Sequence, residues 1–507
     1  MSPSPAPRRT SLVSPVLLAP TEDISAAARS AVLTNDAGGR VMLVELRVNP
    51  GTTVDTARDE FRELFHSTFG DLSEDLEPVA VGRHYMRCVL TPDQVSRLML
   101  GGGAGGSTAE TKALGLIYRI WPDLVVRAHL DRSLTTIQAD AAARTYGCGG
   151  KGVVWAVIDS GIEATHPHFQ ATGTLSAGVV KNLHHDFTFD PTLAKGGPLA
   201  DHFGHGTHIA GIIAGRAPSD PALLRVAGTE RGVGLPTWVE RPLETGTTLS
   251  GVAPQANLVS LKVLDDTGNT LESALLDAID YVRNVNDGGR ELQIHGINMS
   301  LGCAWQPGDY AAGQSPLCRE LDLLVGTGVV AVVSAGNIGA GTATGGVGAD
   351  VLGPTSDVFG QLSTITDPGN AATAITVGST HRYRPHVFGV TFNSSKGPTL
   401  DGRLKPDLVA PGERITSAAA SHQAAEVGPS LEPGTDGLAR YVEMDGTSMA
   451  AAHVSGAVAA FLSARPEFVG QPELVKKQFI DTATDLGRHE FYQGAGLVNL
   501  MRALTNT

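Results

Sequence analysis

Unbroken apolar runs rich in β-branched residues recur from about residue 150 of the chain onwards. Residues 153–158 (VVWAVI) and 329–333 (VVAVV) are clear examples. Residues 258–264 (LVSLKVL) are similar but include two polar positions. A strand without polar alternation is typical of a parallel sheet whose two faces are both covered by helices. These runs therefore predict central parallel strands that are buried on both sides.

Segments of small and apolar residues lie between and after these runs and predict helices. Residues 449–464 are rich in Ala until Pro466 ends the pattern, and residues 205–215 combine Gly, Ala and Ile. Ala favours a helix and proline ends one, so both segments should be helical. Their lack of a polar face indicates burial on every side. A further helix is expected over 271–286.

Three polar side chains stand where these strands and helices begin or end. Asp159 follows the run 153–158, at the carboxyl end of a strand, where open α/β sheets hold their ligand-handling residues. His205 lies in the first turn of one helix, and Ser448 begins another after the turn that Gly446 permits. A serine before a helix is often only an N-cap. With a histidine base and a carboxylate that orients this base, the same serine becomes a nucleophile.

The sequence blocks around these residues resemble the three signatures of the subtilisin-like serine proteases, the subtilases of peptidase family S8. The blocks are Asp-Ser-Gly at Asp159, His-Gly-Thr-His at His205 and Gly-Thr-Ser-Met-Ala at Ser448, in the family order Asp, His, Ser. The resemblance implies a three-layer α/β fold around a mostly parallel central sheet. It also implies a serine endopeptidase that hydrolyses peptide bonds through a catalytic triad and a covalent acyl-enzyme.

Two further blocks extend the resemblance to the rest of the site. The sequence Ser-Ala-Gly-Asn ends at Asn337, which implies that the Asn337 amide donates to the oxyanion together with the backbone N–H of Ser448. The sequence Ser-Leu-Gly at 300–302 resembles the strand end that pairs with the substrate backbone in this family. The substrate-binding residues expected on this basis are Ser300, Leu301, Gly302, Ser334, Ala335 and Gly336.

Residues 40–134 predict a separate small α+β domain. Strands are expected over 41–48, 84–90 and 125–130, and helices over 54–68 and 92–100. This alternation resembles the inhibitory propeptide of secreted subtilases, which implies an intramolecular inhibitor that is cut off within 128–133. The other interpretation is a permanent interaction domain. Residues 1–39, rich in Pro, Ser and Ala, predict a flexible segment, and residues 135–507 predict the catalytic domain.

Composition limits which kinds of partner and which cellular compartment we expect for this protein. The net charge of −14 argues against a nucleic-acid partner, and we expect protein or peptide substrates. No apolar run approaches the length of about 20 residues that a membrane span needs. Four cysteines are too few for a disulfide framework, and Cys303 with Cys318 would pair only in an oxidising compartment. Pro15 and Pro20 interrupt the N-terminal apolar stretch, which favours a cytoplasmic location and leaves a secreted one as the alternative.

This chemistry requires no cofactor and no metal. In calcium-binding subtilases an Asn-rich loop follows the His helix, and residues 216–250 lack that loop. Calcium stays possible, but it would have to use other carboxylates. The pair His205 and His208 would suit zinc in a metal-dependent hydrolase, although a third ligand is not evident. The remaining alternative is a catalytically silent or permanently capped pseudoprotease that binds extended peptides.

Overall fold

The chain forms two compact units, Met1–Arg127 and Ala128–Thr507. The sequence places the corresponding domain boundary after residue 134. The computed structural model describes residues 12–18, 20, 38–49, 51–70, 77–81, 84–100, 113, 115–122, 133–188, 195–219, 223–230, 237–241, 243, 248–303, 310–342, 358–427 and 440–506.

The smaller unit has the element order β-α-β-β-α-β. Its elements are β1 (Arg40–Leu46), α3 (Val54–Phe69), β2 (Val79–Val81), β3 (Tyr85–Leu90), α4 (Pro92–Met99) and β4 (Ile117–Pro122), preceded by the short helix α1 (Pro15–Leu18). The antiparallel sheet has the order β2-β3-β1-β4, which is the ferredoxin-like arrangement. Alternate residues of β1, Met42 and Val44, share one core with Phe61 and Phe65 of α3. The strand expected over 125–130 lies outside the described residues, and β4 was not predicted.

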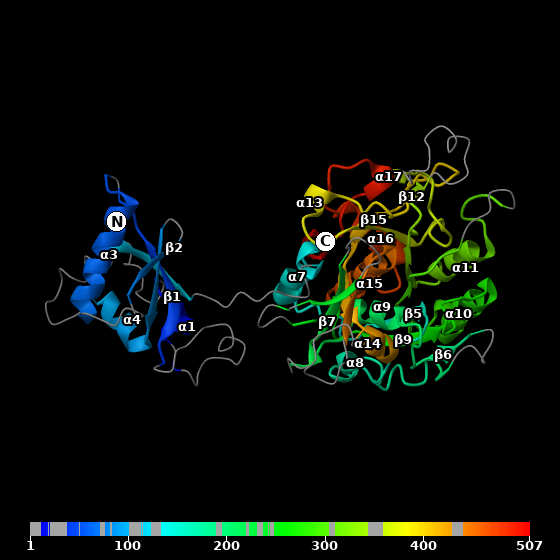
Figure 1. The fold of residues 1–507 in the computed structure, drawn as a ribbon, viewed down its shortest axis with the longest axis horizontal. Helices are drawn as coiled ribbons and strands as arrows, with labels where there is room; N and C mark the ends of the chain where they lie inside the picture. The colour runs from blue at the N-terminus through cyan, green and yellow to red at the C-terminus, as the bar shows by residue number, and fades with distance from the viewer. Residues whose placement is uncertain are drawn as a thin grey trace, which may run out of the picture. The chain divides into compact units, whose positions relative to one another are not determined.

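The larger unit is built on a sheet of seven strands whose pairings are all parallel (Figure 1). The sheet has the order β15-β14-β11-β10-β5-β9-β6. The strands are β5 (Val154–Asp159), β6 (His185–Asp186), β9 (Asn257–Lys262), β10 (Gly296–Met299), β11 (Val330–Ser334), β14 (Ile375–His381) and β15 (Leu408–Glu413).

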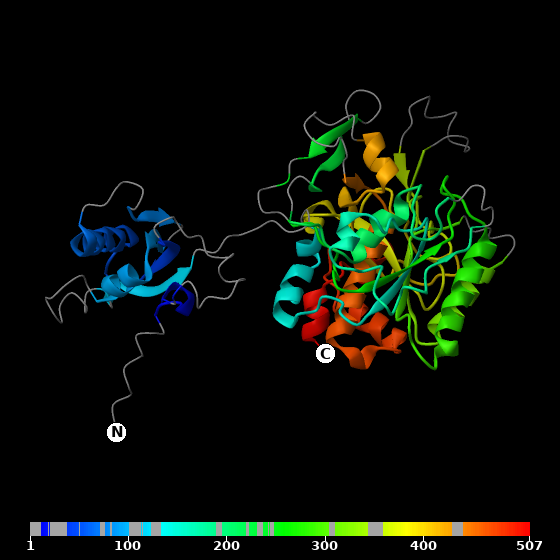
Figure 2. The same ribbon diagram turned by 90° about the horizontal axis from the view of Figure 1, so that it is seen from below.

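Helices cover both faces of this sheet and make three layers (Figures 1 and 2). One face packs against α9 (His205–Ile213) and α15 (Thr447–Ala464), and the other packs against α10 (Glu272–Val285) and α11 (Pro316–Val325). Strand β5 serves both cores. Trp155 and Val157 point to the side of α9 and α15, whereas Ala156 and Ile158 point to the other side. This explains why the run has no polar alternation.

Shorter helices surround the first layer and the loops. They are α6 (Ser133–Thr136), α7 (Ala139–Tyr146), α8 (Pro167–Gln170), α13 (Pro385–Phe388), α14 (Ser421–Val427), α16 (Pro472–Asp481), α17 (Glu490–Gln493) and α18 (Leu500–Thr505), with 3-10 turns at Asp287–Gly289 and Pro466–Phe468. Strands β12 (Ala340–Thr342) and β13 (Val358–Gly360) pair in antiparallel orientation.

The insertion between residues 216 and 250 contributes to a second sheet. Its hairpin, β7 (Val226–Glu230) and β8 (Thr237–Arg241), joins β17 (Tyr441–Met444) and β16 (Ile415–Ala418) in the order β16-β17-β7-β8. Strand β17 leads directly into the turn before α15. The insertion is therefore connected through this sheet to the segment that carries Ser448.

Helix α15 is the central helix of the larger unit. Among the described residues it is the one helix whose length and apolar composition would suit a membrane span, contrary to the expectation that no segment comes near that length. However, 83% of its 18-residue window is buried inside the protein. Its apolar character is therefore explained by its position in the core.

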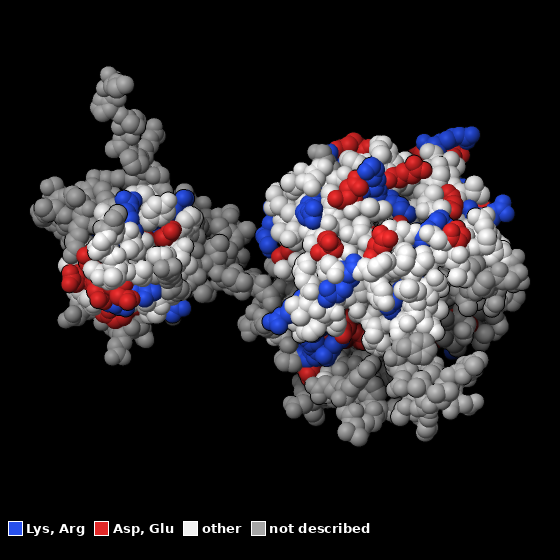
Figure 3. All heavy atoms as spheres, turned by 90° about the horizontal axis from the view of Figure 1, so that it is seen from above, with Lys and Arg blue, Asp and Glu red and all other residues white. Residues whose placement is uncertain are grey.

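The surface carries charges of both signs. On the face of the larger unit in view, Figure 3 shows Lys and Arg interspersed with Asp and Glu rather than gathered in one basic patch. The four cysteines are unpaired, with Cys88, Cys148 and Cys318 buried and Cys303 exposed.

Candidate active site

The carboxyl edge of the parallel sheet brings Asp159 and His205 together. Asp159 is the last residue of β5, and His205 is the first residue of α9. The Nδ1 atom of His205 lies 2.8 Å from Oδ1 and 3.0 Å from Oδ2 of Asp159. The Asp159 side chain is buried, whereas that of His205 is 15% exposed. A carboxylate on Nδ1 fixes the imidazole tautomer in which Nε2 is the basic atom.

The electrostatic environment favours protonation of His205. Burial lowers the pKa of the imidazole, but the charge and hydrogen bond of Asp159, with a further contribution from the charge of Asp201, outweigh this and raise the pKa above its ordinary value. The next histidine of the helix behaves differently. His208 is fully buried, and its Nε2 donates to the carbonyl oxygens of Ile415 and Val442 at 3.0 and 3.1 Å. Burial lowers the pKa of His208 to about 3, so His208 is a neutral structural residue.

Ser448 lies in the first turn of α15, where backbone N–H groups have no partner within the helix. Its hydroxyl donates to the carbonyl oxygen of Ser300 at 3.0 Å, and its own carbonyl oxygen accepts from Ser300 Oγ at 2.9 Å. Within the described residues, this is the hydrogen bond that the Ser448 hydroxyl makes. The preceding Gly446 has φ of 150°, and a Cβ there would lie 3.3 Å from Asn337 Nδ2. The turn therefore requires glycine.

Asn337 lies three residues beyond the end of β11, next to this turn. Its Oδ1 accepts from the backbone N–H of Thr447 at 2.9 Å and from the Thr447 hydroxyl at 3.0 Å. Two donors on one oxygen identify it as Oδ1, and the Nδ2 group is left to donate elsewhere. The Asn337 residue is exposed. An exposed amide donor beside the first N–H groups of α15 can bind a developing oxyanion.

The two predicted substrate-binding segments follow neighbouring strands. Ser300, Leu301 and Gly302 come directly after β10, while Ser334 ends β11 and Ala335 with Gly336 follows it; β10 and β11 pair in parallel. The Ser300, Ser334 and Ala335 residues are buried, and Gly302 is exposed. These segments would therefore contribute backbone groups and shape rather than reactive side chains.

Thr366 lies between the two segments, and the sequence analysis missed it. A Cβ at Gly302 would lie 2.8 Å from Thr366 Oγ1, and one at Gly336 would lie 2.6 Å from the same atom. Thr366 also donates its backbone N–H to the Ala335 carbonyl oxygen at 3.1 Å. This threonine therefore limits the space between the segments, a contact that no local sequence pattern reveals.

A pocket of about 730 Å³ opens beside the turn that carries Ser448. Asp445, which precedes Gly446, lines it together with Arg414, Phe392 and Phe388. The rings of Phe388 and Phe392 are exposed. The pocket thus has an apolar wall and charges of both signs, and Asp445 connects it to the turn before α15.

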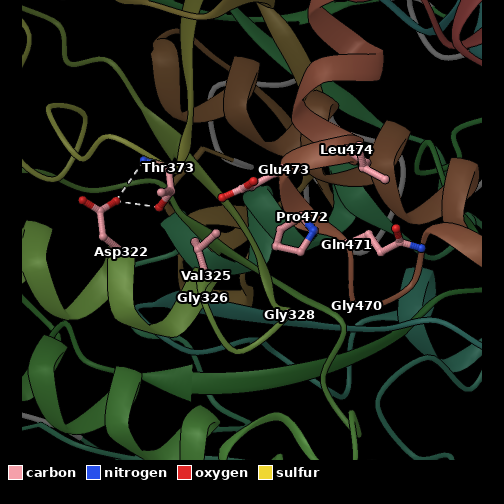
Figure 4. A pocket seen from close by; sticks show the side chains of 10 residues that line it. All are labelled: Asp322, Val325, Gly326, Gly328, Thr373, Gly470, Gln471, Pro472, Glu473 and Leu474. Atoms are coloured by element: carbon pink, nitrogen blue, oxygen red, sulfur yellow. Dashed lines mark hydrogen bonds between the residues drawn. The ribbon is translucent and has the colours of Figure 1, made fainter.

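Another pocket, of about 460 Å³, lies at the opposite edge of the sheet (Figure 4). Its lining includes Gly326 and Gly328, which precede β11, and Leu474 of α16. Figure 4 shows the Asp322 carboxylate turned toward Thr373, whose backbone N–H and hydroxyl donate to it at 2.9 and 2.6 Å. This acidic side chain is therefore already bound within the protein.

Among the described residues, no group of three or more His, Cys, Asp or Glu side chains is arranged to hold a metal ion. The described part of the insertion after α9 forms the strands β7 and β8, in which Glu240 makes an ion pair with Arg225 at 2.8 Å.

Comparison with known proteins shows the family of this chain. Residues 150–497 match the sequence profile of the subtilase family, and this region includes Asp159, His205, Asn337 and Ser448. The chain belongs to the subtilase family. It is 30% identical over 362 residues to subtilisin E of Bacillus subtilis strain 168, which covers 71% of this chain and 68% of that protein. It is 28% identical over 389 residues to serine protease AprX of the same organism, covering 76% and 73%.

A solved structure with a matching region is titled as a cold adapted subtilisin-like serine proteinase. It has 23% identity, covers 69% of this chain and 88% of its own, and gives a TM-score of 0.42.

Membership of the subtilases makes this protein a serine-type endopeptidase, a hydrolase that acts on protein or peptide substrates. The relatives do not support the cytoplasmic location expected from the sequence, and they are compatible with a secreted one.

Proposed function

We propose that Asp159, His205 and Ser448 form the catalytic triad of this subtilase. The observation that carries the proposal is the contact of His205 Nδ1 with both carboxylate oxygens of Asp159, at 2.8 and 3.0 Å. This contact directs the basic Nε2 away from Asp159. His205 then takes the proton of Ser448, and Ser448 Oγ attacks the peptide carbonyl. His205 returns the proton to the leaving amine, and water hydrolyses the acyl-enzyme with the same base.

The substrate itself completes the arrangement of the serine. The Ser448 hydroxyl is bound to the Ser300 carbonyl oxygen, which is also the group expected to accept a backbone N–H from an extended substrate. When the substrate occupies that oxygen, the hydroxyl turns to His205 Nε2. Catalytic hydrogen bonds often form only in the substrate complex, so the free protein need not show this one.

The oxyanion that forms in the attack is stabilised by two donors. These are Asn337 Nδ2 and the backbone N–H of Ser448, which lies at the positive end of α15. Ser300 to Gly302 and Ser334 to Gly336 hold the acyl side of the substrate, with Thr366 between them.

Labelling with a fluorophosphonate probe tests this function. The full-length protein should be labelled, Ser448→Ala should not, and Ser463→Ala should be labelled like the wild type. Ser463 is the matched control because it lies on the same helix, where its hydroxyl donates to the Ala460 carbonyl oxygen at 2.7 Å and accepts from the backbone N–H of Gly150 at 3.1 Å. The pseudoprotease alternative predicts no labelling of any variant, together with binding of extended peptides that are not cut.

We also propose that the smaller unit, Met1–Arg127, is an intramolecular inhibitor of the catalytic unit. Two observations support this proposal. The smaller unit has its own hydrophobic core and a ferredoxin-like strand order, and the match to the subtilase family begins at residue 150, after this unit. The cut should fall before Ser133, because Ser133 is buried and its hydroxyl lies 2.9 Å from Nε2 of His453 in the core. The other residues of the expected cut, 128–132, lie outside the described residues.

Intact mass of the purified chain tests the inhibitor. The wild type should lose about the first 130 residues on incubation and gain peptidase activity, whereas Ser448→Ala should keep its full mass. A wild-type chain that is fully active without any loss of mass would mean that the smaller unit is a permanent interaction domain.

A further inference from the structure

The turn before α9 holds a second buried carboxylate, that of Asp201, which the sequence analysis did not single out. Its Oδ1 accepts from the Ser160 hydroxyl at 2.9 Å and from the backbone N–H groups of Gly204 and Phe203 at 2.7 and 3.2 Å. Its Oδ2 accepts from the backbone N–H and the hydroxyl of Thr207 at 2.8 and 2.6 Å. Burial raises the pKa of Asp201 above its ordinary value, and the hydrogen bonds from Thr207, Gly204 and Ser160 oppose this rise. All five partners donate, so the site fits the ionised carboxylate.

This carboxylate anchors the start of the helix that carries the base. The N-cap residue of α9 is Gly204, which has no side chain to bind the first N–H groups. Asp201 supplies this function from three residues upstream, through Thr207 in the first turn. A negative charge at a helix N-terminus is favourable, and a buried one fixes the position of the turn. His205 is the first residue of this turn.

The same network reaches the residue that orients the base. The Ser160 hydroxyl donates to Asp201 and accepts from the backbone N–H of Gly206 at 2.9 Å, while the backbone N–H of Ser160 donates to Asp159 Oδ1 at 2.8 Å. Ser160 thus connects the end of β5 to the start of α9. Asp201 holds the two elements whose side chains, Asp159 and His205, must remain in contact.

From this geometry we propose that Asp201 is a positioning residue of the catalytic site, which holds His205 against Asp159 and keeps a second negative charge beside the imidazole. The proposal rests on the proposed function of His205 as the general base. Asp201 touches neither substrate nor reacting atoms, so it acts through His205.

Other titratable groups near His205 are Asp159 of β5 and the neutral His208 of α9. Lys262 of β9 is opposite Asp159 in the sheet and lies 3.4 Å from Asp266, and the Glu163 carboxylate accepts from the Ser421 hydroxyl. Asp201 contributes to raising the pKa of His205. Removal of its charge should lower that pKa. Because the base must be neutral, the acidic limb of the activity profile should move to lower pH.

The test compares Asp201→Asn with two variants. Asp322→Asn is the matched control, because Asp322 also accepts from a threonine N–H and hydroxyl, at 2.9 and 2.6 Å, but lies in the pocket at the other edge of the sheet (Figure 4). Asp201→Glu keeps the charge and changes the geometry. The readout is kcat and KM on a peptide substrate across pH, with fluorophosphonate labelling as a check of the serine.

Asp201→Asn should lower kcat by about ten- to a hundredfold with little change in KM, and should shift the acidic limb to lower pH. Asp201→Glu should lower kcat without this shift, and Asp322→Asn should resemble the wild type. If the acidic limb of the Asp201→Asn activity profile lay at the same pH as that of the wild type, the proposal would be overturned, even if the variant were less stable. Should Asp201→Asn not fold, Asp201→Glu with wild-type kcat would overturn it equally. A wild type that is not labelled would instead refute the proposed function itself.

Discussion

At the scale of single residues, the amide of Asn337 should contribute most of the oxyanion stabilisation that a side chain provides. Asn337→Ala removes the Nδ2 donor, and we expect kcat to fall by about 10²–10³-fold while KM changes little. That range was measured for the same kind of donor in subtilisin, a relative of this chain. The control is Asn284→Ala on α10, whose amide donates to Asp280 at 2.9 Å. Steady-state kinetics with equal KM and kcat for Asn337→Ala and the wild type would contradict this role.

Thr447 orients that amide. Its hydroxyl donates to Asn337 Oδ1 at 3.0 Å and accepts from the backbone N–H of Gly336 at 3.2 Å. Thr447→Val removes both bonds, and loss of about 1 kcal/mol of orientation should lower kcat roughly fivefold. If the effect acts through Asn337, Thr447→Val should change little in the Asn337→Ala background. Additive effects in this double-mutant cycle would show that Thr447 acts independently of the amide.

At the scale of elements, the approach of α9 to the end of β5 depends on Gly206. A Cβ at this position would lie 2.2 Å from the Gly161 carbonyl oxygen and 3.2 Å from Asp159 Cβ. Gly206→Ala must therefore push α9 away from Asp159, and overpacking of this kind costs about 1–3 kcal/mol. We expect a lower Tm, and we expect kcat to fall even at temperatures where the variant is fully folded. Gly178→Ala is the control, because a Cβ there meets nothing within 4 Å. A Gly206→Ala variant with wild-type kcat would show that the helix position is not critical.

Some elements could be predicted from the sequence and others could not. Composition alone predicts the strand 153–158 and the helix 449–464, because elements that are buried on every side contain mainly apolar and small residues. The predicted helix 271–286 is observed as Glu272–Val285. By contrast, β7 and β8 depend on pairing with β17, about 200 residues away, and no local pattern encodes that contact. The sequence blocks likewise predicted Asp159, His205 and Ser448. The role of Asp201 was not predicted, because it depends on the five hydrogen-bond donors that the fold places around its carboxylate.

At the scale of the whole molecule, four buried histidines should make stability depend on pH. Burial lowers the pKa of His166 and His453 to about 4 and that of His168 and His208 to about 3. In the unfolded chain each would titrate near 6.5. The unfolded state therefore binds protons that the folded state excludes, and the free energy of unfolding should be full above about pH 6.5 and fall as pH drops toward 4. His205, whose pKa is raised, opposes this trend with one proton.

Urea unfolding between pH 8 and pH 4.5 measures this dependence, with Ser448→Ala as the background to prevent self-digestion. Each histidine should contribute up to about 1.4 kcal/mol per pH unit to the slope. His453 is a suitable site for the test because its fully buried ring has identified partners, among them the Met449 carbonyl oxygen at 2.8 Å and the Ser133 hydroxyl at 2.9 Å. His453→Gln should lower stability at pH 8 yet reduce the slope by about one proton. An unchanged slope would mean that His453 titrates alike in the folded and unfolded states, so that the acid sensitivity would have to come from the carboxylates instead.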